Sequence, residues 1–164
     1  MKLYVASDLS FDPATAWEIF ESKEFESRLE DATDLVCEVL EERMEGEVKV
    51  KRLKYVSRRE LPAIASKALG AKNLTYEQTN RFDRAKSQLS WTVHLPLAGD
   101  RVKVQGVTTI SPTSEGSKRV VDGDISVQVR FIGGQIEKVV VAEFERSMGR
   151  AVDLARDIHR ERQG

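Results

Sequence analysis

Hydrophobic residues in the last fifth of the chain recur at intervals of three and four positions. The stripe follows Ile132-Gly133-Gly134 and consists of Ile136, Val139, Val140, Phe144, Met148, Ala151, Leu154, Ala155 and Ile158. This spacing predicts one amphipathic helix over residues 135–162, which at about 1.5 Å per residue is on the order of 40 Å long. No other segment is long enough to pair with it in a bundle, so we expect the helix to lie along a sheet. Gly149 interrupts the stripe, and we expect it to mark a close contact with a strand.

Most of the chain before that helix alternates between apolar and polar positions. Alternation is typical of β-strands whose two faces differ in environment. It predicts strands at residues 2–10, 34–44, 47–57, 74–82, 88–95, 101–110 and 118–131. From residue 34 onward the links are mostly short and rich in turn residues, as at Glu45-Gly46, which favours an antiparallel meander.

Two short helices are expected between the first two strands. Asp12 and Pro13 supply an N-cap and a first-turn proline for a helix that carries Trp17 and Phe20, and the second helix holds Phe25 and Leu29. Residues 60–70 form a further apolar segment that ends at Gly70, which predicts a short helix or a flap at an entrance. The expected order is strand, two helices, about six strands and a long helix, an α+β domain.

Composition narrows the class of protein. A chain of 164 residues suits one domain with a real core. The 26 Lys and Arg residues nearly cancel the 27 Asp and Glu residues, which argues against a nucleic-acid binder. Cys37 is the only cysteine, so there is no disulfide framework. Apolar runs are too short for a signal peptide or stable membrane insertion, and we expect a cytoplasmic protein.

Several runs in the second half carry a resemblance to a known superfamily. They are Tyr76-Glu77-Gln78-Thr79 through Ser90-Trp91-Thr92-Val93, Val104-Gln105-Gly106, Gly116-Ser117-Lys118-Arg119 through Asp124-Ile125, and Ile132-Gly133-Gly134 through Glu137. With the element order, they make the chain resemble the START-like or SRPBCC superfamily, in a branch known mainly as a domain of unknown function. The resemblance implies a helix-grip fold over residues 1–164. In that fold a curved antiparallel sheet of about six to seven strands wraps around a long C-terminal helix, and two short helices follow the first strand.

The resemblance alone does not select a function. Members bind sterols, phospholipids, quinones or plant hormones, cyclise polyketides, or dock on chaperones. The residues of the strand at 74–82 are more specific, because Leu74, Tyr76, Gln78, Asn80 and Phe82 share one face. If this face points inward, the two amides can anchor a polar atom of a ligand, since a buried amide without a partner costs about 1–3 kcal/mol. The alternative is that this face points to water, and we expect it to point inward.

Apolar positions on the other strands and on the helix complete a predicted ligand-binding lining. The proposed set is Tyr55, Tyr76, Gln78, Asn80, Phe82, Trp91, Val93, Val104, Ile125, Val127, Val140 and Phe144. The alternative is a solid core without a cavity, since valine-rich stripes are often packing. Pockets are common where a long helix grips a curved sheet, and the resemblance also favours a cavity.

Signals for catalysis are weak. His94 alternates with Ser90 and Thr92 on a face that we assign to solvent, and Asp122 and Asp124 are expected to be solvated. No spacing matches a zinc, phosphate-loop or dinucleotide site, so neither a metal nor a cofactor is expected.

Three functions remain open. The leading hypothesis is binding, transport or sequestration of an apolar small molecule, such as a lipid, an isoprenoid or a polyketide-like compound, by a monomer or weak dimer. The second is a cyclase or dehydratase that uses the same pocket, with Tyr76, Gln78, Asn80, Glu77 or Glu143 in the reaction. The third is docking on a chaperone or ribosome through the outer face of the sheet or through the charged side of the long helix.

Overall fold

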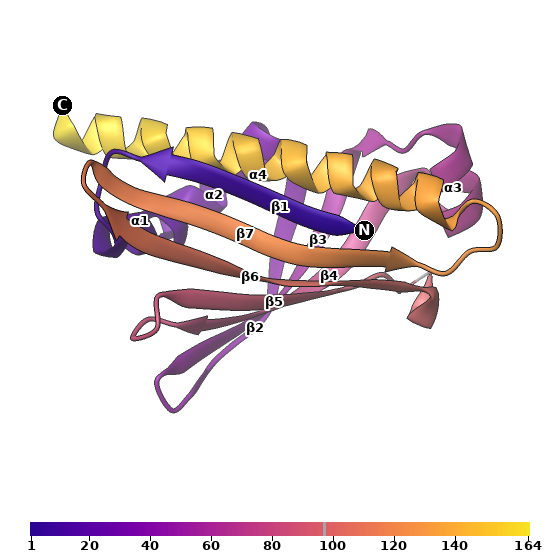
Figure 1. Ribbon diagram of the computed structural model, residues 1–164, viewed down its shortest axis with the longest axis horizontal. Coiled ribbons are helices and arrows are strands. Elements are labelled where there is room, and N and C mark those ends of the chain that lie inside the picture. Colours follow the sequence, from indigo (N-terminus) through magenta and orange to yellow (C-terminus); the bar gives the residue numbers. More distant parts are fainter. Residues whose placement is uncertain (97) are drawn as a thin grey trace.

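A curved antiparallel sheet wraps around the C-terminal helix in the computed structural model (Figure 1). The structure describes residues 1–96 and 98–164, which form seven strands in the order β1-β7-β6-β5-β4-β3-β2. The strands are β1 (Lys2–Leu9), β2 (Leu35–Glu45), β3 (Val48–Glu60), β4 (Asn73–Asp83), β5 (Gln88–His94), β6 (Val102–Thr113) and β7 (Gly116–Val127). Strands β2 to β7 form the predicted meander, and β1 pairs with β7.

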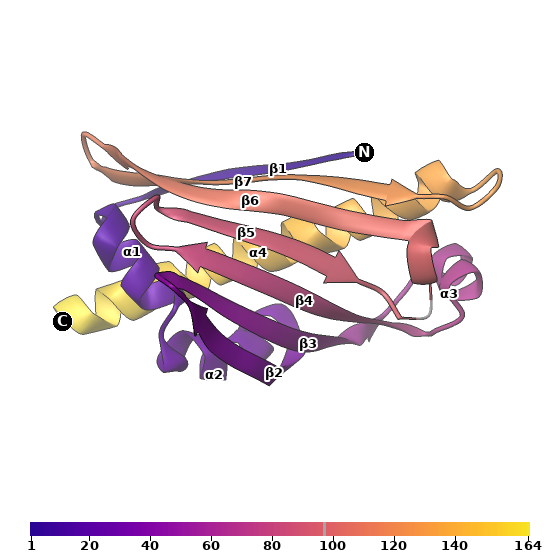
Figure 2. The ribbon, with the colours of Figure 1, turned by 90° about the horizontal axis from the view of Figure 1, so that it is seen from below.

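The helices lie on one face of this sheet. They are α1 (Pro13–Phe20), α2 (Lys23–Thr33), α3 (Ala63–Leu69) and α4 (Gly133–Gln163), and a short 3-10 helix, η1 (Gly99–Arg101), precedes β6. Figure 2 shows α4 crossing diagonally behind the sheet, with α1 and α2 toward its C-terminal half and α3 toward its start. Asp12 caps α1 by accepting a hydrogen bond from the Thr15 backbone N–H at 2.7 Å. The predicted helix-grip fold is confirmed.

The last strand is shorter than the alternation predicts. It ends at Val127 because its neighbour β6 begins at Val102, which is the register partner of Val127. Beyond this point residues 128–132 form a loop, in which Phe131 has a left-handed φ of 70° and is 90% exposed. The expected strand to residue 131 is therefore wrong at its end, since a strand without a partner has no ladder to join.

Gly149 does not mark a close contact. Apart from the adjoining backbone of α4 itself, no atom of the described residues lies within 4 Å of the position that a Cβ would occupy there, so the expected packing against a strand is wrong. The absence of a side chain at Gly149 therefore allows no closer packing of α4.

Two apolar clusters divide the interior along α4. The first half of α4, including Ile136, Val140 and Phe144, packs with the middle and α3-proximal parts of the strands. The second half, including Val152 and Ile158, packs with α1, α2 and the opposite strand ends. Beside Ala151, which packs against the second cluster, the sheet and the helices leave space.

Candidate functional site

A cavity of about 160 Å³ lies between the α1–α2 pair, α4 and the inner face of the sheet. Its lining consists of Trp17, Phe20, Glu21, Phe25, Glu26, Leu29, Cys37, Lys51, Leu53, Tyr55, Gln78, Asn80, Leu89, Arg119 and Ala151. Ala151 is the contribution of α4, and its single methyl group leaves room that a larger side chain would fill. We call this space the α1–α2 cavity.

One wall of the α1–α2 cavity is apolar and well anchored. The Trp17 ring packs on Phe82 with centroids 4.7 Å apart, and its Nε1 donates a hydrogen bond to Ser87 Oγ at 2.7 Å. Phe20 and Phe25 meet edge to face at 5.2 Å across the α1–α2 junction. The two helices are thus held over the sheet by aromatic contacts that also face the cavity.

The opposite wall is polar and comes from the strands. Gln78 Nε2 donates a hydrogen bond to Asn80 Oδ1 at 2.7 Å, so the two amides satisfy part of each other's capacity. Cys37 and Tyr55 are register partners on β2 and β3, and burial raises the pKa of both groups. Both are therefore protonated at neutral pH and offer O–H and S–H groups rather than charges.

Charged groups from both the strands and the helices also line the cavity. Lys51, a buried residue on β3, makes an ion pair with Glu26 of α2. Glu21 lies 3.7 Å from Lys49, and burial raises the pKa of its carboxyl, an effect that the nearby Lys51 and Lys49 only partly offset. The acids of the cavity are thus matched by lysines on β3.

Arg119 is the exception among these charges. It sits on β7 in phase with the inward residues Val121 and Ile125, and its guanidinium lies 4.7 Å from the centroid of the Phe20 ring. Its Nη1 atom is buried, and no acceptor within residues 1–96 and 98–164 takes a hydrogen bond from it. Burial lowers the pKa of Arg119 to about 10. Within the described chain, the cavity therefore contains a cation without an anionic partner.

The predicted ligand-binding residues fall into two groups. Tyr55, Gln78 and Asn80 line the α1–α2 cavity, and Phe82 supports its wall through Trp17. The others belong to the buried cluster on the first half of α4: Tyr76, Trp91, Val93, Val104, Ile125, Val127, Val140 and Phe144. The hollow beside Tyr76 and Phe144 holds only about 10 Å³, so this part of the interior is packed. The inward face predicted for Gln78 and Asn80 agrees with the structure.

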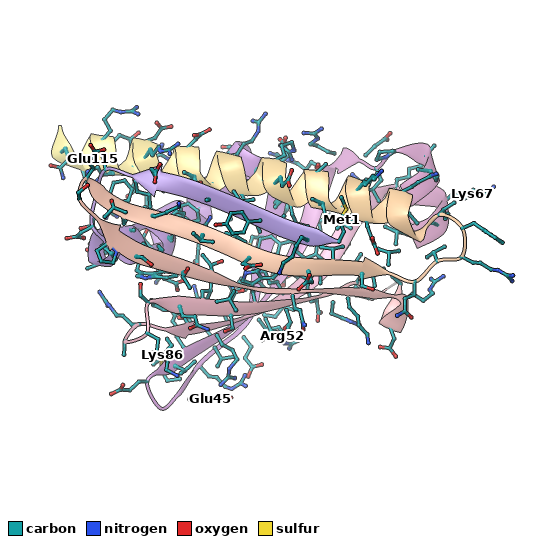
Figure 3. The ribbon with its side chains drawn as sticks, in the orientation of Figure 1. Met1, Glu45, Arg52, Lys67, Lys86 and Glu115 are labelled. Atoms are coloured by element: carbon teal, nitrogen blue, oxygen red, sulfur yellow. The ribbon has the colours of Figure 1, made fainter. Side chains whose placement is uncertain are left out.

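Most of the groups considered for catalysis lie away from this cavity. Glu77 is on the outer face of the sheet, 3.6 Å from Arg52, which points away from α4 (Figure 3). Glu143 pairs with Arg146 at 3.3 Å, and His94 is exposed. Asp122 and Asp124 are solvent-exposed partners of Lys2, as expected.

The segment at residues 60–70 is not positioned over the cavity. It contains α3, which lies near the start of α4, at the opposite end from α1 and α2 (Figure 1). The entrance flap expected there is therefore not part of this site. The α1–α2 pair itself is the cover.

Sequence reasoning missed the two cationic side chains, Lys51 and Arg119. The sequence does contain a signal. Lys51 lies two and four positions before Leu53 and Tyr55, and Arg119 lies two and four positions before Val121 and Gly123, so each cation shares a strand face with inward residues. A cation in the inward phase of a strand indicates either an ion pair or a ligand contact. Here Lys51 has the ion pair, whereas Arg119 has none among the described residues.

A larger hollow of about 670 Å³ is a surface groove at the C-terminal end of α4. It lies between Asp8, Glu115, Arg156 and Arg160, and His159 in it packs on Phe11 with ring centroids 4.3 Å apart. Most of its lining is exposed and of mixed charge, so we regard the more enclosed α1–α2 cavity as the site.

In the described ranges, no group of three or more His, Cys, Asp and Glu side chains is placed to hold a metal ion. No helix of the described chain combines the length and the apolar character that crossing a bilayer requires.

Known structures share this fold. A protein from Thermus thermophilus has a TM-score of 0.68 at 14% identity, over 96% of this chain and 95% of that chain. A START superfamily protein from Mycobacterium smegmatis has a TM-score of 0.61 at 15% identity, over 92% and 93%. The di-domain ARO/CYC StfQ from the steffimycin biosynthetic pathway has a TM-score of 0.56 at 14% identity, over 99% of this chain and 46% of that chain. The fold is therefore START-like.

Sequence comparison gives the family. No curated protein matches the sequence. Residues 5–158 match the family described as "Protein of unknown function (DUF2505)". Because this match spans nearly the whole chain, the protein belongs to the DUF2505 family.

Proposed function

We propose that the protein binds a small amphipathic molecule in the α1–α2 cavity. The observation that carries this proposal is a partly enclosed space whose lining combines aromatic side chains of α1 and α2 with amide, phenol, thiol and charged groups. Small-molecule sites commonly combine an apolar lining with a few convergent polar groups. The START-like fold adds support, since similar structures include a START superfamily protein and an ARO/CYC.

The volume limits what the cavity encloses. A cavity of about 150 Å³ accommodates a benzene molecule, and the α1–α2 cavity measures about 160 Å³. The enclosed part of the ligand is therefore about the size of one ring or a short branched chain. Apolar burial at about 25 cal/mol per Å² supplies much of the affinity. A longer lipid, isoprenoid or polyketide-like compound requires α1 and α2 to move outward.

A substitution that fills the cavity tests this proposal. Ala151→Leu places three additional carbons in the space, whereas Ala142→Leu adds the same group at an exposed position of the same helix, beside a separate hollow. Wild-type protein and both variants are purified from the native host and compared by native mass spectrometry. We expect a bound small mass in the wild type and in Ala142→Leu, and its loss in Ala151→Leu. No bound mass in any sample, or equal occupancy in all three, contradicts the proposal.

A catalytic role is the second candidate, and one residue favours it. Glu21 lines the cavity, and burial raises the pKa of its carboxyl, which is a property of general acids. A binding module retains ligand affinity in Glu21→Gln and has no turnover to lose. An enzyme of the cyclase or dehydratase kind retains affinity but loses conversion of the ligand, which mass spectrometry of the released compound detects.

A further inference from the structure

We infer that the ligand of the α1–α2 cavity is a small carboxylic acid whose carboxylate binds Arg119. This inference rests on the proposed function and specifies the chemical class of the ligand. It follows from a charge that the fold leaves unpaired in an otherwise paired site.

Burying a guanidinium nitrogen of Arg119 without an acceptor costs free energy. A guanidinium carries its charge permanently near neutral pH and has five N–H donors. In this protein Nη1 is buried without an acceptor in the described residues, and the guanidinium carbon lies 4.7 Å from the centroid of the Phe20 ring. A cation–π contact does not satisfy the N–H donors in the plane of the guanidinium. Nη1 of Arg119 therefore has no acceptor among the described residues, and a bound anion would provide one.

The acids of the cavity do not fill this role. Glu26 makes its ion pair with Lys51, and Glu21 lies near Lys49, which also contacts Glu42 at 3.2 Å. These carboxylates come from the C-cap of α1, from α2 and from β2, and they meet lysines on β3, whereas Arg119 comes from β7. The site thus has one side where carboxylates pair with lysines, and another where Arg119 has no anionic partner among the described residues.

The separation of Arg119 from the paired acids favours a ligand with a single negative charge over a dianion. A carboxylate presents two oxygens at the spacing of the guanidinium fork and forms two parallel hydrogen bonds with it. A phosphate dianion carries more charge and meets repulsion from Glu21 and Glu26 across a space of about 160 Å³. The aromatic wall, which includes Trp17 and Phe25, suits a ring or branched chain attached to the carboxylate.

Benzoate and benzyl alcohol are suitable probes because they share a ring and differ in charge. Each is titrated into the intact protein and followed by heteronuclear NMR, with wild type compared with Arg119→Gln and Arg119→Lys. Lys118→Gln is the control, since Lys118 is the exposed neighbour of Arg119 on the same strand. We expect benzoate to bind wild type and Lys118→Gln at least about tenfold more tightly than benzyl alcohol does. Arg119→Gln should abolish this preference, and Arg119→Lys should retain part of it.

The outcomes separate this inference from the proposed function. If benzyl alcohol and benzoate bind the cavity of the wild type equally well, the carboxylate inference is wrong and ligand binding stands. If the preference for benzoate persists in Arg119→Gln, Arg119 is not the anchor and the inference is again overturned. If neither probe shifts the resonances of cavity residues, the proposed function fails as well. Thermal unfolding of each variant establishes whether it is folded. If Arg119→Gln is unfolded, the affinities of Arg119→Lys for the two probes are compared with those of the wild type instead.

Discussion

The guanidinium of Arg119 on β7 stacks over the ring of Phe20 on α1, with 4.7 Å between its central carbon and the ring centroid. This contact joins the inner face of the sheet to the helix that covers the cavity. It offsets only part of the cost of burying the charge, because Nη1 has no acceptor among the described residues. A residue that costs stability inside a pocket is typical of a functional site, where stability is sacrificed for recognition.

The first prediction follows from that cost. Arg119→Met keeps much of the side-chain volume and removes the unpaired charge, and such replacements in interiors are often stabilising. We expect the Tm to rise by about 2–4 °C, which corresponds to about 1 kcal/mol in a chain of this size. Differential scanning calorimetry without added ligand measures the shift. Arg52→Met is the control, because Arg52 is exposed on the outer face, and its Tm should stay close to that of the wild type. A clear fall in the Tm of Arg119→Met means that Arg119 is a structural residue.

The second prediction concerns Glu21 and pH. Burial raises the pKa of Glu21 in the folded protein above its ordinary value of 4.5, despite Lys51 and Lys49 nearby and with Glu26 adding to the rise. Between the ordinary and the raised pKa the folded state binds more protons than the unfolded chain, so this carboxyl makes stability fall as pH rises. Glu21→Gln should therefore increase the free energy of unfolding at about pH 7 and have little effect at about pH 4. Urea denaturation at both values tests this, and a variant that loses stability at neutral pH contradicts it.

The third prediction concerns the packing of Trp91 in the core. Its indole ring lies across the neighbouring strands, so that a Cβ at Gly123 would be 2.8 Å from Trp91 Cη2 and 2.7 Å from the backbone oxygen of Gln105. Gly123→Ala forces the ring to shift and should cost about 1–3 kcal/mol of unfolding free energy. In a Trp91→Phe background the cost should fall, although the contact with Gln105 remains. Equal costs in both backgrounds, measured as a double-mutant cycle by urea denaturation, would show that the indole is not the obstacle.

The fourth prediction is the opposite effect at another glycine. Gly149 lies inside α4 with open space around the position of a Cβ. Gly149→Ala should therefore stabilise the protein by about 1 kcal/mol, the difference in helix propensity between the two residues. Urea denaturation of this variant beside Gly123→Ala gives changes of opposite sign. A loss of stability in Gly149→Ala would mean that the glycine has a packing role after all.

Local patterns in the sequence were sufficient to predict the architecture. The three-and-four spacing from Ile136 to Ile158 predicts α4, and the capping pair at Asp12 and Pro13 predicts the start of α1. Strand ends were harder, because the end of β7 at Val127 depends on where β6 begins. Pairing of this kind is a tertiary property that alternation within one segment does not contain.

The position of the cavity was harder to predict than its existence. Alternation places Gln78 and Val104 on the same inner face of the sheet, but it does not say that one borders a cavity and the other lies in packed core. That distinction depends on which side chains of α4, such as Phe144 or Ala151, lie over each part of the sheet. Helix rotation and crossing angle decide this, and they emerge only when the whole domain packs.

The most direct test of ligand binding in the α1–α2 cavity is a crystal structure of the wild-type protein grown with benzoate. We predict electron density for the ring between Trp17, Leu53 and Ala151, with both carboxylate oxygens on the guanidinium of Arg119. Benzoate bound only elsewhere, or α1 and α2 packed against the sheet so that their side chains fill this space, would contradict the account.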